Sequence, residues 1–358
     1  MGKSFRVVFF LIALFGLRLR YIGLLLFRIL LTSFMVTTLF LDRLLFRRAV
    51  AAPLDRPVFL IGHLRSGTTF LHRYLTDIFP DFRSLLMWEM VFPALTARAL
   101  LKPFLPVMRR MSFNGVYDPD IHETGLFEPE TDDIALSMRY FDGLLSWIYF
   151  HAWREYPDDA ALQRALDDTV GKERFVEHLG AVYRRAVAGS GRRMFSKSFC
   201  LLFNIDMVRS RFPGAKFLLV VRDPVEAVVS LCSLERSVQR RINDFDRIAP
   251  DLQRRYFRNL YRTSLIYYRR FCDEAAKGSP DTLVIRYPEL FSDFEGTMRR
   301  AAGFLGLRVT PAVEALLREQ AEKQGGFSSK HRYAPEEFGL TAEEIRRDFA
   351  FVYRQFEV

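Results

Sequence analysis

A short loop between an apolar run and a helical pattern carries the first residues that could do chemistry. It follows the strand-like residues 58–61 and reads Gly62-His63-Leu64-Arg65-Ser66-Gly67-Thr68-Thr69. The backbone N–H groups of such a loop, with the start of the helix behind it, bind phosphate oxygens. Arg65 adds a guanidinium. The pattern predicts an anion site at residues 62–69, with an ordinary strand-to-helix turn as the alternative, because such glycine spacings recur by chance.

The loop differs from one that hydrolyses a nucleotide. A hydrolysing loop needs a lysine followed by serine or threonine directly after its second glycine, for the β/γ-phosphates and for Mg²⁺. This chain has Thr68 and Thr69 at those positions. The loop therefore favours a nucleotide whose phosphates need no metal. A P-loop kinase stays as an alternative, although its lysine is missing.

A second strand-to-helix junction has the same form. Residues 216–221 are strand-like, Arg222-Asp223-Pro224 interrupt them, and a helix is predicted from Val225. Ser230 lies two turns into that helix, and Arg222 stands at the carboxyl end of the strand, where ligands of open α/β sheets collect. Alone, Arg222 and Asp223 would be read as a surface ion pair. Together with the first loop they favour a second part of one anion site.

The two junctions together resemble the sulfotransferases that use 3′-phosphoadenosine 5′-phosphosulfate. In that family a [KR]-S-G-T-T loop holds the 5′-phosphosulfate, and an arginine eight residues before a serine holds the 3′-phosphate. Residues 65–69 match the first element, and Arg222 with Ser230 matches the second. Lys197-Ser198 stands where the family has a Lys-[Ser/Thr] pair. The resemblance covers residues 57–356 approximately, and residues 330–349 look like the carboxyl-terminal stretch of bacterial-type members.

The resemblance implies a fold, a donor and a set of binding residues. The fold is α/β, a doubly wound parallel sheet of the P-loop-like sulfotransferase type with extra helices. Lys197 and Arg65 would donate to the leaving oxygen or the 5′-phosphate. The donor is a co-substrate, and no metal is expected, since the six histidines form no metal-ligand cluster. The expected nucleotide-binding residues are Arg65, Ser66, Gly67, Thr68, Thr69, Arg222, Ser230, His331 and Arg332.

The catalytic base is not given by the simplest match. Soluble family members have a histidine directly after the Lys-[Ser/Thr] pair, and this chain has Phe199. An acidic, partly apolar segment at residues 123–133 offers carboxylates, whose pKa such surroundings can raise toward neutrality. We predict Glu130 as the base, with Glu128 and His122 as the next candidates. The alternative is a solvated helix start, capped by Thr131 or Asp132 before a helix at residue 134.

Periodicity predicts the elements that position these residues. Strands are expected at residues 58–61, 194–196, 216–221 and 282–287, alternating with helices, which indicates a doubly wound sheet. One helix is expected over residues 160–188. A helical stretch at residues 87–111 should break at its prolines. No linker or repeat divides the chain, so we expect one catalytic domain at residues 51–358.

The first fifty residues have a different composition. They hold eight basic residues against one acid, Asp42, and so supply most of the net charge of +10. This local basicity, interleaved with apolar runs, favours a membrane surface and argues against nucleic acid as a partner. An interfacial amphipathic helical arm at residues 1–50 fits best, because arginines interrupt each apolar run before the ~20 residues of a spanning helix. A spanning or re-entrant helix and an arm packed on the body or on a second subunit are the alternatives.

The remaining expectations concern place, acceptor and activity. Three cysteines without a CxxC pair indicate a reducing compartment, so we expect a membrane-associated protein on the cytoplasmic side. The apolar arm and a Phe-rich insertion favour a lipid or another hydrophobic alcohol over a soluble sugar as the small-molecule acceptor. The same fold could also serve as a membrane-associated nucleotide-binding protein without activity. The oligomeric state is not indicated.

Overall fold

The computed structural model describes residues 2–110, 124–325 and 334–358. These residues form two compact units, which are described separately. Unit 1 holds Met1–Pro53, Leu85–Ser190 and Leu234–Tyr256. Unit 2 holds Leu54–Ser84, Gly191–Ser233 and Phe257–Val358. Unit 2 contains the sheet and both predicted anion-binding junctions.

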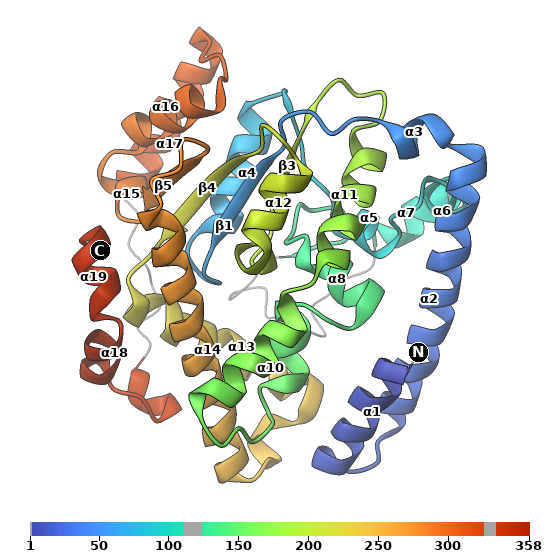
Figure 1. Ribbon diagram of the computed structural model, residues 1–358, viewed down its shortest axis with the longest axis vertical. Coiled ribbons are helices and arrows are strands. Elements are labelled where there is room, and N and C mark those ends of the chain that lie inside the picture. Colours follow the sequence, from blue (N-terminus) through green and yellow to red (C-terminus); the bar gives the residue numbers. More distant parts are fainter. Residues whose placement is uncertain (1, 111–123, 326–333) are drawn as a thin grey trace. The chain divides into compact units, whose positions relative to one another are not determined.

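The elements follow one another along the chain as labelled in Figure 1. The strands are β1 (Val58–Gly62), β2 (Phe82–Arg83), β3 (Arg193–Lys197), β4 (Lys216–Val221) and β5 (Thr282–Arg286). The helices of the first half are α1 (Gly2–Phe15), α2 (Leu19–Leu45), α3 (Arg47–Ala51), α4 (Thr68–Ile78), α5 (Met87–Val91), α6 (Leu95–Leu101), η1 (Lys102–Phe104), α7 (Leu105–Met108), α8 (Asp133–Tyr140), α9 (Leu144–Ser146), the π-helical turn η2 (Trp147–His151), α10 (Asp159–Val170) and α11 (Glu173–Val187). Those of the second half are η3 (Cys200–Asn204), α12 (Ile205–Arg211), α13 (Pro224–Asn243), η4 (Phe245–Arg247), α14 (Pro250–Ala276), α15 (Glu289–Ser292), α16 (Phe294–Leu305), α17 (Pro311–Gly325), η5 (Pro335–Phe338), α18 (Ala342–Asp348) and α19 (Ala350–Phe356).

The sheet of unit 2 confirms the predicted α/β architecture. Its five strands are all parallel and follow the order β2-β3-β1-β4-β5. Figure 1 labels β3, β1, β4 and β5 of this sheet. The central strand β1 is buried along its whole length, as its continuous apolar run requires of a parallel strand covered on both faces. From β1 the chain goes to the edge strand β2, returns to β3 beside β1, and then crosses to β4 and β5 on the other side of β1. The strand order therefore reverses at β1, where α/β sheets bind ligands.

Apolar side chains alternate between the two faces of the sheet. Val58 and Leu60 of β1 pack with α4, α16 and α17 on one face. Phe59 points the other way, where its ring stacks on Phe217 and meets Phe212 at the end of α12. Tyr267 of α14 reaches the same strand and donates to the carbonyl of Gly62 at 2.8 Å. The two-sided cover fixes β1 and the loop that follows it.

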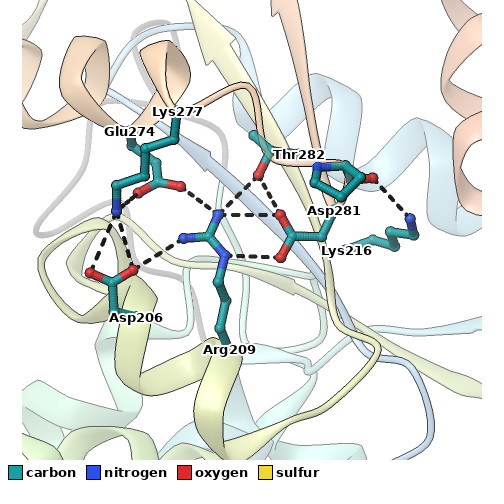
Figure 2. A network of polar contacts seen from close by, with 8 residues as sticks. Asp206, Arg209, Lys216, Glu274, Lys277, Asp281 and Thr282 are labelled. Atoms are coloured by element: carbon teal, nitrogen blue, oxygen red, sulfur yellow. Dashed lines mark hydrogen bonds and ion pairs between the residues drawn. The ribbon is translucent and has the colours of Figure 1, made fainter.

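A polar network ties α12 and α14 to the amino-terminal end of β5 (Figure 2). Arg209 of α12 donates to both carboxylate oxygens of Asp281, at 2.9 and 3.2 Å, and to Thr282 at 3.1 Å. The same guanidinium pairs with Glu274 of α14, whose carboxylate is almost fully buried. Asp206 and Lys277 complete the network. It lies at the opposite strand ends from the predicted anion site, so its role is structural.

Unit 1 is helical and includes the N-terminal residues. Helices α1 and α2 form a hairpin in which Val7, Val8, Leu11 and Tyr21 pack with Phe141. By length and composition α2 is the one helix among the described residues that could cross a membrane, and it lies near the N-terminus. An apolar N-terminal helical arm is therefore present, as predicted. Whether residues 1–50 form a separate domain from residues 51–358 stays a prediction.

Two predicted helical stretches differ in detail. The stretch expected as one helix over residues 160–188 is split into α10 and α11. The amide of Gly171 still bonds the carbonyl of Asp167, but the backbone of Lys172 is extended and starts a new helix. The stretch at residues 87–111 breaks into α5, α6, η1 and α7 at its prolines, as predicted, up to the last described residue, 110.

Candidate functional site

Three neighbouring strands bring the predicted cations to one edge of the sheet. Strands β3, β1 and β4 lie side by side, with Lys197 opposite Leu60 and Gly62 opposite Val220. The carboxyl ends of these strands therefore place Lys197, the loop after β1 and Arg222 together. Parallel pairing is what makes positions so distant in sequence converge.

The loop after β1 needs its two glycines for different reasons. A Cβ on Gly62 would lie 2.8 Å from the carbonyl oxygen of Val220 and 2.9 Å from the Thr68 methyl group, so β1 and β4 could not close. Gly67 has φ +78°, and a Cβ there would meet the ring of Tyr287 at 2.6 Å. Arg65 also has a positive φ, +69°. A left-handed backbone at a non-glycine residue is unfavourable and is typical of functional loops.

The two predicted anion-binding elements are joined by hydrogen bonds. Arg65 Nε donates to Ser230 Oγ at 3.0 Å. Arg222 Nη1 donates to the carbonyl of Arg65 at 2.7 Å, and its Nε donates to Glu226 at 2.9 Å. Helix α4 begins directly behind, at Thr68, and the first N–H groups of a helix have no acceptor within it. The loop, α4 and α13 thus present cations, hydroxyls and N–H groups around one point.

Lys197 is the third cation of this edge. Its side chain is almost fully buried, and Nζ donates to Thr69 Oγ1 at 2.9 Å. A buried ammonium retains its charge only with polar partners or an anion close by. Phe199, where the soluble relatives of the resemblance have histidine, is also buried. It offers no titratable group.

The loop at residues 62–69, Lys197, Arg222 and Ser230 form what we call the cradle. Aromatic residues that the sequence did not single out hold it in place. Tyr287 directly follows β5, and its ring packs on Gly67 and lies under the Arg222 guanidinium, with 4.3 Å between Cζ and the ring centroid. Tyr268 of α14 donates to the carbonyl of Arg222 at 2.9 Å. Burial raises the pKa of both phenols, so both stay neutral. Tyr287 could have been found by its place at a strand end, whereas Tyr268 lies in a long helix with no local signal.

Two buried histidines near the loop are uncharged at neutral pH. Burial, together with the charge of Lys197, lowers the pKa of His72 to about 3. Burial lowers the pKa of His63 to about 4, although its bond to the Leu64 carbonyl acts in the opposite direction. His72 bonds the carbonyl of Phe195 at 3.0 Å. These rings support the loop and the end of β3.

The predicted base and its alternatives lie outside unit 2 or outside the described residues. Glu130 belongs to unit 1 and is buried, whereas Glu128 is exposed. Residues 126–129 are held to the start of α5, where Leu86 bridges Pro129. Glu130 and the cations at the carboxyl ends of the strands belong to different units, so the role of Glu130 as the base stays a prediction. His122, His331 and Arg332 lie outside the described residues.

Helix α8 does not have the side-chain cap that the alternative reading of the acidic segment predicted. Asp132 stands at the N-cap position but makes no side-chain cap; it accepts from Tyr183 at 2.9 Å and is fully buried. Thr131 donates to the carboxylate of Asp133 at 2.6 Å. The acidic segment is therefore not a plain solvated helix start, because its last four residues are buried.

Comparison with known proteins decides the family. A model described as the sulfotransferase family matches residues 57–311, which is well over half of the chain. The chain belongs to the sulfotransferase family. It is therefore a transferase of that family, as the resemblance implied. The curated relatives include the omega-hydroxy-beta-dihydromenaquinone-9 sulfotransferase Stf3 of Mycobacterium bovis, 25% identical over 278 residues, which are 74% of this chain and 67% of the relative. The protein of the same name from Mycobacterium tuberculosis matches equally.

Solved structures of sulfotransferases share the fold. Sulfotransferase STF1 of Mycobacterium tuberculosis has a TM-score of 0.69 at 19% identity, covering 98% of this chain and 92% of its own. Sulfotransferase STF9 of Mycobacterium avium has a TM-score of 0.67 at 23% identity, covering 87% and 79%. The predicted sulfotransferase-type α/β fold is confirmed by these likenesses.

Proposed function

We propose that this sulfotransferase moves a sulfuryl group from 3′-phosphoadenosine 5′-phosphosulfate to the hydroxyl, or amine, of a hydrophobic, lipid-like acceptor. One observation carries the proposal. Arg65 bonds Ser230, and Arg222 bonds the backbone of Arg65, so the two nucleotide-binding elements of the resemblance form one cradle. A surface ion pair or a chance glycine turn would not require this convergence.

The cradle suits a donor that carries phosphate groups at both the 3′ and the 5′ position of its ribose. The loop, the start of α4 and Lys197 would hold the 5′-phosphosulfate through N–H groups and an ammonium. Arg222 and Ser230 would hold the 3′-phosphate. In the described structure Arg222 contacts the exposed carboxylate of Glu226, a partner that a phosphate replaces at little cost because such surface pairs are weak.

The proposed reaction needs charge stabilisation and one proton acceptor. The acceptor oxygen attacks sulfur, the bond between sulfur and the bridging oxygen breaks, and 3′-phosphoadenosine 5′-phosphate leaves with the electron pair. Lys197 and Arg65 stabilise the charge that develops on the bridging oxygen. The proton of the acceptor hydroxyl passes to a base, for which Glu130 remains our candidate.

A hydrophobic acceptor is supported by a relative and by the composition of the chain. The curated relative is named for omega-hydroxy-beta-dihydromenaquinone-9, a molecule that carries a hydroxyl group. Exposed apolar side chains concentrate on α2 and on the turn from α6 to α7. Both point to a substrate that resides in a membrane rather than in solution.

The alternative is a nucleotide-binding protein of the same fold without activity. Phe199 in place of the histidine of soluble members is the observation that favours it. The test is incubation of the full-length protein with ³⁵S-labelled donor and fractionated membrane lipids, followed by mass analysis of labelled fractions for an added sulfate. Labelled lipid that disappears in the Lys197→Ala variant supports the proposal. Tight binding of the nucleotide with no labelled product across lipid, sterol and phenol acceptors would favour the inactive protein.

A further inference from the structure

The outer side of helix α2 is an uncharged apolar stripe. Every exposed side chain between Arg20 and Arg43 is uncharged. Leu26, Leu30 and Phe40 each expose more than half of their surface. The stripe spans about 30 Å, given a rise of 1.5 Å per residue. A soluble surface rarely carries such a length of apolar side chains without a partner.

The inner side of α2 is bonded to the rest of unit 1 near both of its ends and in its middle. Near the start, Tyr21 donates to Asn243 Oδ1 at 2.8 Å, in a buried bond. In the middle, Arg28 is buried, bonds the carbonyl of Met138 and lies over the Phe141 ring. At the end, the carboxylate of Asp42 is fully buried. A helix that crossed a bilayer would have to break all three attachments, so α2 lies along the folded unit.

Asp42 also joins α2 to a second exposed apolar element. Its carboxylate accepts from the backbone of Leu95 and Thr96, at 2.9 and 2.8 Å, and so caps the start of α6. Arg185 completes the site at 2.7 Å. Burial opposes the charge on Asp42, but these hydrogen bonds outweigh burial and lower its pKa. The carboxylate thus stays charged at neutral pH and locks α6 beside the end of α2 (Figure 1).

The turn from α6 to α7 continues the apolar surface. Leu100, Phe104 and Val107 expose between 57% and 64% of their surface, although all are large apolar side chains. Prolines near the starts of η1 and α7 interrupt the regular helix here, so α6 is followed by a 3-10 turn and a short helix. No part of the core or of the cradle uses these three side chains.

The exposed charged side chains next to this apolar surface are basic. Arg43, Arg47 and Arg48 follow the stripe of α2, and Lys102, Arg109 and Arg110 flank the turn; all six are exposed. Among the described residues, none of the six makes a salt bridge with a carboxylate. Basic side chains beside apolar ones match the phosphates and acyl chains of an anionic bilayer.

We propose that the α2 stripe (Leu26, Leu30, Phe40) and the turn (Leu100, Phe104, Val107) form one docking surface for an anionic lipid bilayer. Helix α2 lies in the plane of the interface, with the apolar side chains in the acyl boundary and the six cations among the headgroups. A second copy of the chain fits less well, because a symmetric pairing would set these cations against each other. The inference deepens the proposed function, because it states how the enzyme reaches a lipid acceptor. Only the biological role of the docking surface rests on the proposed function.

The test is flotation of the full-length protein with two kinds of vesicle, phosphatidylcholine alone and phosphatidylcholine mixed with phosphatidylglycerol. The turn variant carries Leu100→Ser, Phe104→Ser and Val107→Ser, and the stripe variant carries Leu26→Ser, Leu30→Ser and Phe40→Ser. Leu316→Ser on α17 is the matched control, since that side chain is also exposed. We expect each triple variant to reduce partitioning to anionic vesicles about tenfold or more, because each removes three large apolar side chains from the interface. The control should bind like the wild type.

The outcomes separate the inference from the proposed function. Retention of 3′-phosphoadenosine 5′-phosphate affinity shows that each variant is folded. High salt should release the wild type, as an interfacial anchor requires. If only the stripe variant loses binding to anionic vesicles, the turn is not part of the docking surface. If the wild type resists alkaline carbonate extraction, α2 does not lie in the plane of the interface. A wild-type dimer without lipid that both variants dissociate would assign the surface to a second copy. Vesicle binding without any sulfuryl transfer would leave the docking surface standing and reject the proposed function.

Discussion

The guanidinium of Arg222 lies over the ring of Tyr287, 4.3 Å from its centroid, and the same ring covers Gly67. One aromatic side chain therefore sets both halves of the cradle, the arginine expected at the 3′-phosphate and the glycine of the phosphate loop. The amide of Tyr287 bonds the carbonyl of Val221 at 2.8 Å, which fixes the ring relative to the end of β4.

Removal of the Tyr287 ring should weaken nucleotide binding. Tyr287→Ala is expected to reduce 3′-phosphoadenosine 5′-phosphate affinity about tenfold, because the arginine loses a cation–π contact of ~0.5–2 kcal/mol and the loop loses its support. Tyr287→Phe keeps the ring face and should bind almost normally. Calorimetric titration of both variants checks this. Equal losses in the two would show that the hydroxyl, rather than the ring, is what matters.

Arg222 should discriminate the 3′-phosphate. Arg222→Ala is expected to weaken 3′-phosphoadenosine 5′-phosphate by ~2–4 kcal/mol, the range for a lost partner of a buried charge. Adenosine 5′-phosphosulfate, which lacks that phosphate, should lose much less. Competition binding with both nucleotides measures the difference. Similar losses for the two ligands would reject the assignment of Arg222.

Glu130 is tested by separating turnover from donor binding. Glu130→Gln should reduce turnover by about 10² to 10⁴, the usual effect of losing a general base, and leave donor affinity within a few-fold. Glu155→Gln is the control, since that side chain is exposed and lies outside the acidic segment. If Glu130→Gln keeps more than about a tenth of the activity and His122→Ala does not, the histidine is the base.

Glu235 should make stability depend on pH in an unusual direction. Burial raises the pKa of this carboxyl from 4.5 to about 8, against the smaller effect of the hydrogen bond from Tyr256. Between those values the folded protein holds a proton that the unfolded chain has lost. The contribution of Glu235 to the free energy of unfolding is therefore complete below pH 4.5. It falls by up to ~1.4 kcal/mol per pH unit as the pH rises, and the decrease levels off above about pH 8.

Glu235→Gln removes that titration, so the variant should gain stability relative to the wild type as the pH rises through the same window. Urea unfolding at several pH values measures the slope. Parallel pH profiles for the two proteins would mean that Glu235 is ionised in the folded state.

The Arg209 network of Figure 2 should stabilise the fold without touching the cradle. Arg209→Ala is expected to lower the free energy of unfolding by about 2–4 kcal/mol, because it leaves the buried Glu274 carboxylate without its guanidinium. Arg254→Ala, which removes an exposed ion pair with Asp251, is the matched control and should cost less than about 0.5 kcal/mol. Unchanged nucleotide affinity would confirm the structural role, and a loss comparable to that of Arg222→Ala would contradict it.

The sequence determined the parts of the protein in which local pattern and chemistry coincide. The loop at residues 62–69 and the junction at Arg222 were recognisable because a phosphate cradle needs glycine, hydroxyl and guanidinium groups at fixed spacing after a strand. The parallel sheet followed from apolar runs that alternate with helices. The apolar N-terminal helices were equally visible, because they depend on composition alone.

Tertiary structure decided the contacts between residues far apart in the chain. The stacking of Arg222 on Tyr287 and the bond from Arg65 to Ser230 arise from strand order, which no local pattern contains. The orientation of α2 was open in the sequence, where the stripe and a spanning helix look alike. The bonds of Tyr21, Arg28 and Asp42 attach one side of the helix to unit 1, because a buried polar side chain must find a partner, and they support the interfacial orientation that we propose.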